Sequence, residues 1–434
     1  MQTAVRVPAW QYLEVDGERL VRPNYVGAGL ANVAPTVLRL LAPASEAALP
    51  GLSEGYLPGR LTRDLRAIVV LVADGLGHVQ LEREIAAGNA PVLGGLIARA
   101  TLGERVSYAA ITSVFPTTTV AALGALNSAA LPIEHGLLGY TLFLQEYGLM
   151  ADMIRWGPLE RRGSFADQEF GYSPEGFFWA ETLYQRLHAA GVEQTFAINP
   201  SAFAGTALTR MLHQGATYRG YLATSSLTPI ATRLLGTADG PVYVYAYWPT
   251  VDMISHVHGP ESDEHAAEVA NFDAAVGRLV DRLPSRDDTL LIVTADHGHV
   301  QTAPDRQVPL GAHPRLLSLL AAPPAGERRA VYLHPQPGGA AAVAAYAREH
   351  LREVAAVLTR DEAVDEGLFG APTLPARAAA RIGEVLLLPR DNLQIVSGGG
   401  AQDGTPGERP PLFHGLHGGL SEPEALVPLL ALRL

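Results

Sequence analysis

The sequence predicts an α/β protein in which helices flank a mainly parallel central sheet, with a smaller α+β lobe inserted late in the chain. Three observations predict this class. Runs of apolar, β-branched residues recur, and they lack the alternating polar residues of a strand with one exposed face. Two of these runs lie on either side of a segment with helical spacing of apolar residues. From about residue 302 onward the chain becomes rich in Pro and Gly, which indicates a separate lobe.

The first apolar run, Ala67–Ala73, is followed directly by an Asp-Gly pair. A strand of this kind is typical of a parallel sheet that is buried on both faces. Val242–Tyr247 and Leu290–Thr294 have the same character, so we expect three such strands. Between the last two, apolar residues recur at helical spacing and end before Pro284, which predicts a βαβ unit; they are Val269, Phe272, Val276, Leu279, Val280 and Leu283.

Helix and strand also alternate elsewhere in the first 300 residues. Glu181–Ala190 has a helical pattern that Gly191 ends, and Phe196–Ile198 is a further short strand. The lobe at residues 302–401 should contain an Ala-rich helix near Ala340–Ala356 and short strands near Val331 and Val385. The apolar tail should then return to the main sheet, so residues 1–301 and 402–434 form the expected main domain.

Composition limits the possible functions. The chain has 434 residues, 48% of them hydrophobic, which is enough for a large globular core. Its formal net charge of -12 disfavours binding of a nucleic-acid polymer, although metal ions could make a local site positive for a small anion. Cysteine is absent, which excludes disulfides and thiolate metal sites and leaves His, Asp and Glu as ligands.

The N-terminal segment bears on localisation. Residues 1–20 lack the basic stretch and apolar core of a secretory signal, and the longest apolar runs are far shorter than the roughly 20 residues of a membrane span. We therefore expect a cytoplasmic protein without membrane attachment. The sequence leaves the oligomeric state open.

An acidic residue stands at or near the end of each of the three apolar strands. These residues are Asp74, Asp252 and Asp296. Because the carboxyl ends of parallel strands border the ligand crevice of an open α/β sheet, the three carboxylates should converge there. One Asp-Gly after a strand is more often a turn, but three acids accompanied by histidines make a turn-only role improbable.

Histidines complete this pattern. Asp252 and His256 are four residues apart, so one helical turn places both on one face, and His297 directly follows Asp296. The segment from His414 to Gly419 adds His417, which glycines flank. Together these residues supply oxygen and nitrogen ligands for two metal ions, each with an open position.

The motifs Val-Ala-Asp-Gly at Asp74, Asp-x-x-x-His at Asp252, Ala-Asp-His-Gly at Asp296 and the late His-Gly at His417 stand in a characteristic order. With them the chain resembles the alkaline phosphatase superfamily, and most closely its nucleotide pyrophosphatase/phosphodiesterase branch. The resemblance spans about Val69–Gly419, apart from a poorly matched lobe after residue 302. It implies an alkaline phosphatase-like fold, with the main domain as its catalytic core.

The resemblance also implies a division of ligands between two divalent ions. Zinc is the usual metal, although manganese or iron can occupy the same oxygen and nitrogen donors. One ion would be bound by the nucleophile together with Asp74, Asp296 and His297, and the other by Asp252, His256 and His417.

The nucleophile is expected among Thr117, Thr118 and Thr119, just before the helical pattern of Val120–Asn127. A hydroxyl at a helix N-terminus lies beside N–H groups that favour a phosphate. In the family a small-residue turn follows this helix, here Ser128-Ala129, and counting back by the usual helix length gives Thr119, with Thr118 as the alternative. Thr119 could instead merely cap the helix, a common role for threonine.

Two further positions bear on substrate choice. Where nucleotide pyrophosphatases have an asparagine that contacts a phosphoryl oxygen, this chain has Tyr140, whose phenol can donate one hydrogen bond. No arginine lies close to Thr119 in the sequence, whereas alkaline phosphatases use one to hold a terminal phosphate, which disfavours a monoesterase.

The resemblance thus implies hydrolysis of phosphodiester or pyrophosphate bonds in a small phosphate ester, with a nucleotide as the expected substrate. Thr119 would attack in line and form a phosphoryl-enzyme intermediate. The alternatives are a phosphonate hydrolase, a phosphomonoesterase, or a metal-binding scaffold without turnover. Sulfatases require a modified Cys or Ser in another motif.

Other residues near the motifs are expected to have structural roles. Most histidines near a metal site support the ligands or are simply polar, so direct ligation is the minority expectation for His78, His135, His258, His299 and His414. Among these, His414 would be the first substitute for His417. Tyr243, Tyr245, Tyr247 and Trp248 belong to a strand and are expected in the core, not in a base-stacking platform.

Overall fold

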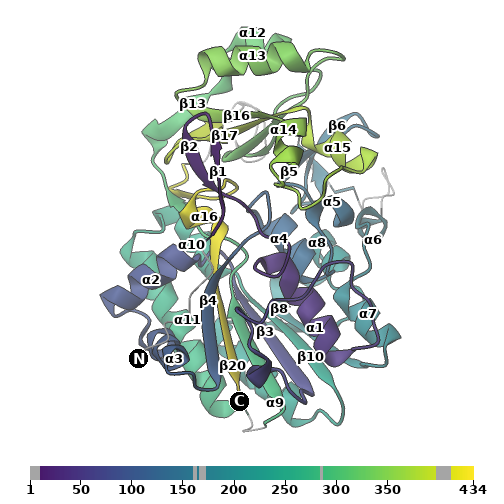
Figure 1. Cartoon of the computed structure of the whole chain (residues 1–434), viewed down its shortest axis with the longest axis vertical. Helices are drawn as coiled ribbons and strands as arrows, with labels where there is room; N and C mark the ends of the chain where they lie inside the picture. Colours follow the sequence, from purple (N-terminus) through teal and green to yellow (C-terminus); the bar gives the residue numbers. More distant parts are fainter. Residues whose placement is uncertain (1–9, 160–163, 166–172, 284–286, 397–411) are drawn as a thin grey trace.

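The structure is a computed structural model that describes residues 10–159, 164–165, 173–283, 287–396 and 412–434. Two sheets of seven strands each dominate it. In Figure 1 one sheet occupies the lower half of the molecule and the other the upper half. Within the described ranges no helix combines the length and apolar character that a membrane crossing needs.

The lower sheet has the strand order β4-β20-β11-β3-β10-β8-β9. Its centre is β3 (Ala67–Ala73), which is buried along its whole length and lies parallel between β10 (Val242–Trp248) and β11 (Thr289–Thr294). This confirms the three expected strands. Parallel strands β8 (Gln194–Pro200) and β9 (Thr217–Tyr221) extend the sheet on one side.

On the other side of the lower sheet the chain's last strand, β20 (Leu426–Arg433), lies between β11 and β4 (Val106–Thr112). It runs antiparallel to both neighbours and is the one strand of this sheet that does so. The tail therefore returns to the main sheet, as its apolar sequence predicts.

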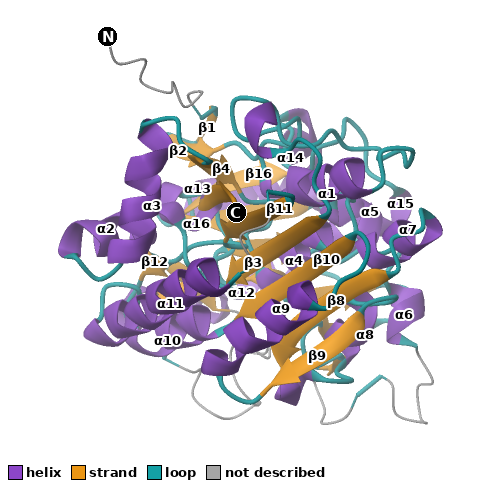
Figure 2. Ribbon diagram, turned by 90° about the horizontal axis from the view of Figure 1, so that it is seen from below, coloured by secondary structure: helices purple, strands orange, loops and turns teal. Residues whose placement is uncertain are grey.

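Two groups of helices cover the faces of this sheet, as Figure 2 shows. The predicted helix of the βαβ unit is α11 (Asp263–Arg282), which buries Val269, Phe272, Val276 and Leu279. Around it on the same face lie α2 (His78–Ala87), α3 (Pro91–Thr101), α9 (Leu227–Gly236) and α10 (Thr250–His258). The opposite group contains α1 (Val33–Leu41), α4 (Thr119–Leu126), α5 (Pro132–His135), α6 (Pro174–Phe177), α7 (Leu183–Ala189) and α8 (Ala207–Leu212).

The upper sheet is antiparallel and has the order β16-β17-β15-β14-β5-β6-β7. Four strands come from the expected lobe: β14 (Ala325–Glu327), β15 (Ala330–Leu333), β16 (Ala355–Thr359) and β17 (Val385–Pro389). Helix α13 (Ala340–His350) packs on this sheet around a separate apolar cluster. The predicted helix to Ala356 is too long, because β16 begins at Ala355.

The remaining three strands of the upper sheet come from an earlier part of the chain. They are β5 (Thr141–Leu144), β6 (Leu149–Asp152) and β7 (Gly157–Pro158). Residues 1–301 were assigned to the main domain from sequence, but this segment leaves the lower half and pairs with β14 through Thr141 and Gly326. The upper sheet is thus assembled from two separate segments.

A buried ion pair joins the upper sheet to the C-terminal segment of the lower half. Arg329, between β14 and β15, donates to both carboxylate oxygens of Glu424, from Nε at 3.1 Å and from Nη2 at 2.8 Å. Glu424 lies in α16 (Glu422–Ala425), and both side chains are almost inaccessible. Burial alone raises the pKa of Glu424, but Arg329 and the hydrogen bonds from Ser421 and Gly419 outweigh burial and hold this pKa below its usual value.

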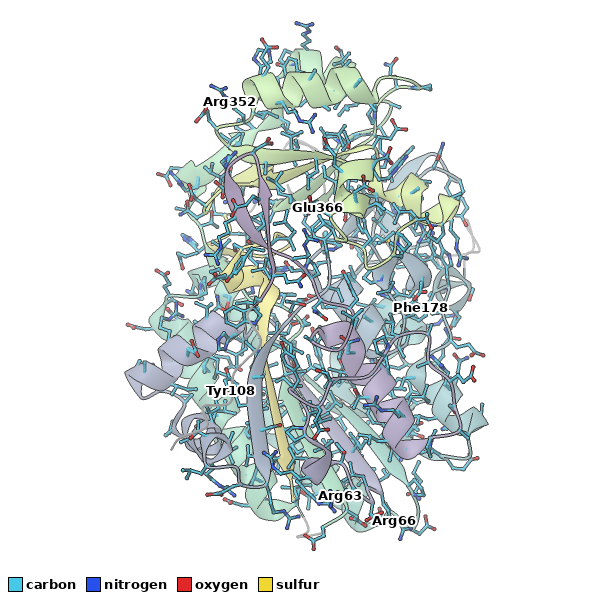
Figure 3. All side chains as sticks on the ribbon, viewed as in Figure 1. Arg63, Arg66, Tyr108, Phe178, Arg352 and Glu366 are labelled. Carbon is cyan, nitrogen blue, oxygen red and sulfur yellow. The ribbon has the colours of Figure 1, made fainter. Side chains whose placement is uncertain are left out.

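We predict that Arg329→Met lowers the free energy of unfolding by about 3–5 kcal/mol, because it leaves the Glu424 carboxylate buried without its cation. Urea unfolding at neutral pH measures the change. Arg352→Met is the matched control, since Arg352 and Glu353 are 71% and 84% exposed and such a pair contributes at most about 1 kcal/mol. Figure 3 places Arg352 at the far end of the upper half. Equal losses in the two variants would contradict the assigned role.

Candidate active site

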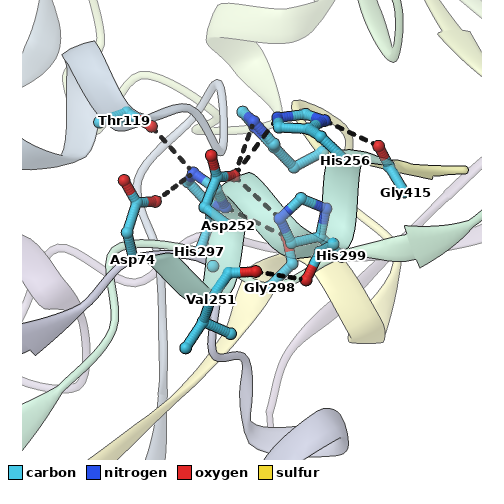
Figure 4. A network of polar contacts seen from close by, with 12 residues as sticks. Asp74, Thr119, Val251, Asp252, His256, His297, Gly298, His299 and Gly415 are labelled. Atoms are coloured by element: carbon cyan, nitrogen blue, oxygen red, sulfur yellow. Dashed lines mark hydrogen bonds and ion pairs between the residues drawn. The ribbon is translucent and has the colours of Figure 1, made fainter. Parts of the chain in front are cut away.

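Three carboxylates meet at the carboxyl edge of the lower sheet. Asp74 directly follows β3, Asp296 follows β11 after one residue, and Asp252 lies in the first turn of α10, which begins just after β10. Because these strands are parallel neighbours in register, their ends lie side by side. The close-up in Figure 4 shows Asp74 and Asp252 on either side of His297.

In both Asp74 and Asp296 one carboxylate oxygen accepts hydrogen bonds from the protein, and the other has no donor among the described residues. Asp296 Oδ1 accepts hydrogen bonds from the backbone N–H groups of Gly75 at 3.1 Å and His297 at 3.0 Å. Asp74 Oδ2 accepts from the phenol of Tyr247. Among the described residues nothing donates to Asp74 Oδ1 or Asp296 Oδ2, although both atoms are buried. Buried carboxylate oxygens need a partner, and a bound cation would supply one for both of these atoms.

The imidazole of His297 completes this first group. Its Nε2 lies 3.4 Å from Asp74 Oδ1 and 3.5 Å from Asp296 Oδ2, and all three residues are buried. Burial raises the pKa of Asp74 well above its usual value, and the charges of Asp296 and Asp252 raise it further. Burial likewise raises the pKa of Asp296. A positive ion would relieve both effects.

A second group surrounds Asp252. Its Oδ1 lies 3.3 Å from Nε2 of His256 and 3.7 Å from Nε2 of His417. One donor atom from each of the three residues could contact a single ion. Burial raises the pKa of Asp252, but the charge of His256 and the hydrogen bond from His299 outweigh it, so the pKa is well below its usual value.

The three histidines of these two groups are oriented in the same way. Nδ1 donates to a backbone carbonyl in each: His256 to Gly415 at 2.8 Å, His417 to Thr117 at 2.9 Å and His297 to Gly298 at 3.2 Å. A neutral imidazole that donates from Nδ1 keeps a lone pair on Nε2. All three Nε2 atoms face the carboxylates, which is the usual arrangement of histidine metal ligands with their supporting carbonyls.

Of the three candidate threonines, Thr119 faces these groups. Its Oγ1 lies 3.2 Å from His297 Nε2. Thr119 is the first residue of α4, whereas Thr118 is the N-cap, so a capping role for Thr119 is wrong. Thr117 is used elsewhere, since its hydroxyl donates to the Gly419 carbonyl at 2.8 Å and thereby ties α4 to the His417 loop.

The structure brings His299 into the site, in contact with a proposed ligand and not in either proposed set of ligands, which agrees with the minor chance of direct ligation expected from sequence. His299 Nε2 lies 2.9 Å from Asp252 Oδ1, and the ring is buried. Burial lowers the pKa of His299 to about 4, although Asp252 opposes this effect. The absence of a side chain at Gly75 makes room for the ring, because a Cβ there would lie only 2.7 Å from His299 Nε2. The φ of +73° at this position also favours glycine. Its position two residues after His297 was the available signal.

The other four histidines near the motifs have partners elsewhere. His135 packs under α4 at Gly124 and its Nε2 lies 3.2 Å from the Ala121 carbonyl, and burial lowers its pKa to about 3. The remaining three contact the following groups: His78 the phenol of Tyr108, His258 the carboxylate of Glu264, and His414 the backbone of His256 and Thr302.

Tyr140 lies at the boundary between the two halves. Its backbone N–H donates to Glu327 Oε1 at 2.6 Å, and its hydroxyl donates to Asp152 Oδ2 at 3.1 Å. The single phenolic hydrogen is therefore already used, and burial raises the pKa of Tyr140. To donate to a phosphoryl oxygen, as expected from sequence, the phenol would have to release Asp152.

The aromatic residues of β10 are all buried, in agreement with the expected core role. Tyr247 does more than pack, because its hydroxyl donates to Asp74. This contact was not predicted from sequence. The parallel register places the end of β10 beside the end of β3, where Asp74 follows. A tyrosine one residue before the end of β10 was therefore the sequence feature that could have indicated the contact.

A sequence profile for type I phosphodiesterase / nucleotide pyrophosphatase matches residues 68–420, which is most of the chain and includes every residue of both groups. The chain belongs to the type I phosphodiesterase / nucleotide pyrophosphatase family. The resemblance seen in the sequence is thereby confirmed.

Solved structures of known proteins share the fold of this family member. Murine ectonucleotide pyrophosphatase / phosphodiesterase 5, an inactive variant in complex with AMP, superposes with a TM-score of 0.58 at 16% identity, over 84% of this chain and 87% of that one. Phosphonoacetate hydrolase from Sinorhizobium meliloti 1021, in complex with phosphonoformate, gives a TM-score of 0.60 at 17% identity, over 98% and 93% of the two chains. The alkaline phosphatase-like fold class is thus confirmed.

Matches to other known proteins are short. An uncharacterized pyrophosphatase/phosphodiesterase of Schizosaccharomyces pombe is 33% identical over 73 residues, which is 16% of this chain and 15% of that protein. The catalytic subunit of mouse GPI ethanolamine phosphate transferase 3 is 37% identical over 71 residues, 16% of this chain and 6% of that protein. The matched segments span only a small part of either relative.

We predict that Tyr247→Phe weakens the binding of a divalent ion at Asp74 and Asp296 by about 10- to 100-fold, because the residue that orients the Asp74 carboxylate is lost. Competition with a chromophoric chelator measures the affinity. Tyr243→Phe, on the same face of β10 but further from Asp74, is the control and should bind metal like the wild type. Unchanged affinity in Tyr247→Phe would show that Asp74 does not depend on the phenol.

Proposed function

We propose that this chain is a two-metal phosphoesterase that hydrolyses phosphodiester or pyrophosphate bonds in small phosphate esters such as nucleotides. One observation carries the proposal. Two buried carboxylate oxygens without a donor among the described residues, Asp74 Oδ1 and Asp296 Oδ2, lie beside an imidazole nitrogen that the Thr119 hydroxyl also contacts. A metal site adjacent to a hydroxyl nucleophile explains this arrangement.

The residues fit two divalent ions. Among the described residues three sets of side chains lie close enough to share an ion. Two of them have no residue in common: Asp74, Asp296 and His297 form one, and Asp252, His256 and His417 form the other, whereas the third combines Asp252 with His297 and His299. Each of the two separate groups offers oxygen and nitrogen donors, a set that suits zinc and also accepts manganese or iron. Bound there, two such ions would supply Lewis acidity and positive charge toward the phosphoryl oxygens and the nucleophile.

Thr119 is the proposed nucleophile. Its Oγ1 would lose its proton to solvent and attack phosphorus in line, and the bond from phosphorus to the leaving oxygen would break, with that oxygen taking up a proton from solvent. The rest of the diester would stay on Thr119 as a phosphothreonine ester. The first N–H groups of a helix have no partner within the helix, so the N-terminus of α4 can hold the other phosphoryl oxygens. Water would then hydrolyse the phosphothreonine and restore the Thr119 hydroxyl.

Phosphonate hydrolysis is the second candidate. The structure of a phosphonoacetate hydrolase covers 98% of this chain, and its superposition extends over both halves. Thr119 and the two groups of proposed ligands would serve either substrate, because each presents a tetrahedral phosphorus with a leaving group in line. Comparison of turnover among a diester, a monoester and phosphonoacetate distinguishes the candidates.

We predict that Thr119→Ala lowers kcat on bis-p-nitrophenyl phosphate on the order of 10³-fold or more, since it removes the attacking oxygen. Steady-state kinetics of the metal-loaded enzyme measure the change. Thr118→Ala is the matched control, because the Thr118 side chain makes no capping hydrogen bond, and it should keep kcat within about tenfold of the wild type. The reverse order of the two variants would assign the attack to Thr118.

We further predict that EDTA abolishes turnover and that Zn²⁺ restores it, with Mn²⁺ and Fe²⁺ as comparison metals. The metal-loaded enzyme should hydrolyse bis-p-nitrophenyl phosphate faster than p-nitrophenyl phosphate, measured as kcat/KM. A monoester preference would move the chain toward the phosphatases. Turnover that persists after the metal content has fallen to zero would contradict the proposed role of the ions.

A further inference from the structure

His299 lies in the site but belongs to neither proposed set of three ligands. It is held between β11 and β12 (Val300–Gln301), and 1% of its surface is exposed. Its Nε2 is 2.9 Å from Asp252 Oδ1, the shortest distance from any imidazole nitrogen to this atom among the described residues. Asp252 is therefore contacted by a third histidine, besides His256 and His417.

Neighbouring rings fix the orientation of His299. The ring centroid of His299 lies 5.0 Å from that of His256 and 5.2 Å from that of His417, in edge-to-face contacts of 84° and 83°. On the backbone side, Gln80 Nε2 donates to the His299 carbonyl at 2.5 Å. Such packing leaves the imidazole little freedom to leave Asp252.

The hydrogen-bond pattern of His299 is the opposite of that of the three proposed ligands. Those three donate from Nδ1 to a carbonyl, and their Nε2 atoms stay 3.3, 3.4 and 3.7 Å from the nearest carboxylate oxygen. His299 instead makes its hydrogen bond through Nε2, at 2.9 Å from Asp252 Oδ1. A carboxylate accepts, so Nε2 of His299 must carry the hydrogen. A nitrogen that carries a hydrogen is not a metal ligand, and Nδ1 of His299 is buried without a partner among the described residues.

We propose that His299 is a positioning residue for Asp252. By donating Nε2–H to Oδ1, it fixes the carboxylate in the orientation in which Asp252 meets His256 and His417. Its effect is confined to the ion of that group and does not extend to the ion at Asp74, Asp296 and His297. This inference rests on the two-ion centre of the proposed function.

The test is the zinc stoichiometry and affinity of the full-length chain, measured by elemental analysis after desalting and by competition with a chromophoric chelator. The wild type should bind two ions. His299→Ala should bind one of them about 10- to 100-fold more weakly and leave the other unchanged. His299→Gln, whose amide can still donate to Asp252, should recover most of the affinity. His258→Ala, an exposed histidine on α10, is the control and should match the wild type.

Double variants identify the affected ion. His299→Ala with His256→Ala should keep one ion at the wild-type affinity, because both changes act on the same group, whereas His299→Ala with Asp74→Asn should bind both ions more weakly than the wild type. Three results would overturn the inference: two tight ions in His299→Ala, equal loss of both ions, or a Gln variant no better than Ala. A wild type that binds no ions would instead overturn the proposed function, so the two failures are distinguishable.

Discussion

The site depends on one electrostatic constraint: the buried carboxylates of Asp74 and Asp296 and the partly buried carboxylate of Asp252 share a single edge of a parallel sheet. Parallel strands must end side by side, so acids at three neighbouring strand ends face one another in a region with little water. Two unit charges 4 Å apart repel by about 4 kcal/mol at an effective dielectric constant of about 20. Protons or cations must compensate that charge, and the orientation of three imidazole nitrogens toward the carboxylates favours cations.

The rest of the molecule holds the loops that carry this charge. Glu424 contacts two of them, because its carbonyl accepts from Gly298 N at 2.9 Å and its Oε1 accepts from Gly419 N at 2.9 Å. Arg329 neutralises the same carboxylate from the upper sheet. The loop after His297, the loop after His417 and the second sheet therefore share one buried anchor, which relates the stability of the upper half to the geometry of the site.

Local patterns determined what could be predicted from sequence. Continuous apolar runs identified the central strands, and the spacing of Asp252 and His256 needed only one helical turn. Contacts between distant segments left no such signal: Thr141 pairs with Gly326 in the upper sheet, and Tyr247 on β10 contacts Asp74 at the end of the neighbouring strand β3. A supporting role was the general expectation for histidines near the motifs, but the sequence did not show that His299 contacts Asp252. Whether Thr119 caps α4 or begins it depended on a helix boundary one residue away, which sequence patterns do not resolve.

The most direct test of this account is a crystal structure of the zinc-loaded protein with anomalous diffraction at the zinc edge. The account predicts two anomalous peaks, one in contact with Asp74, Asp296 and His297 and beside Thr119 Oγ1, the other in contact with Asp252, His256 and His417. A single peak, or peaks away from the ends of β3, β10 and β11, would contradict it.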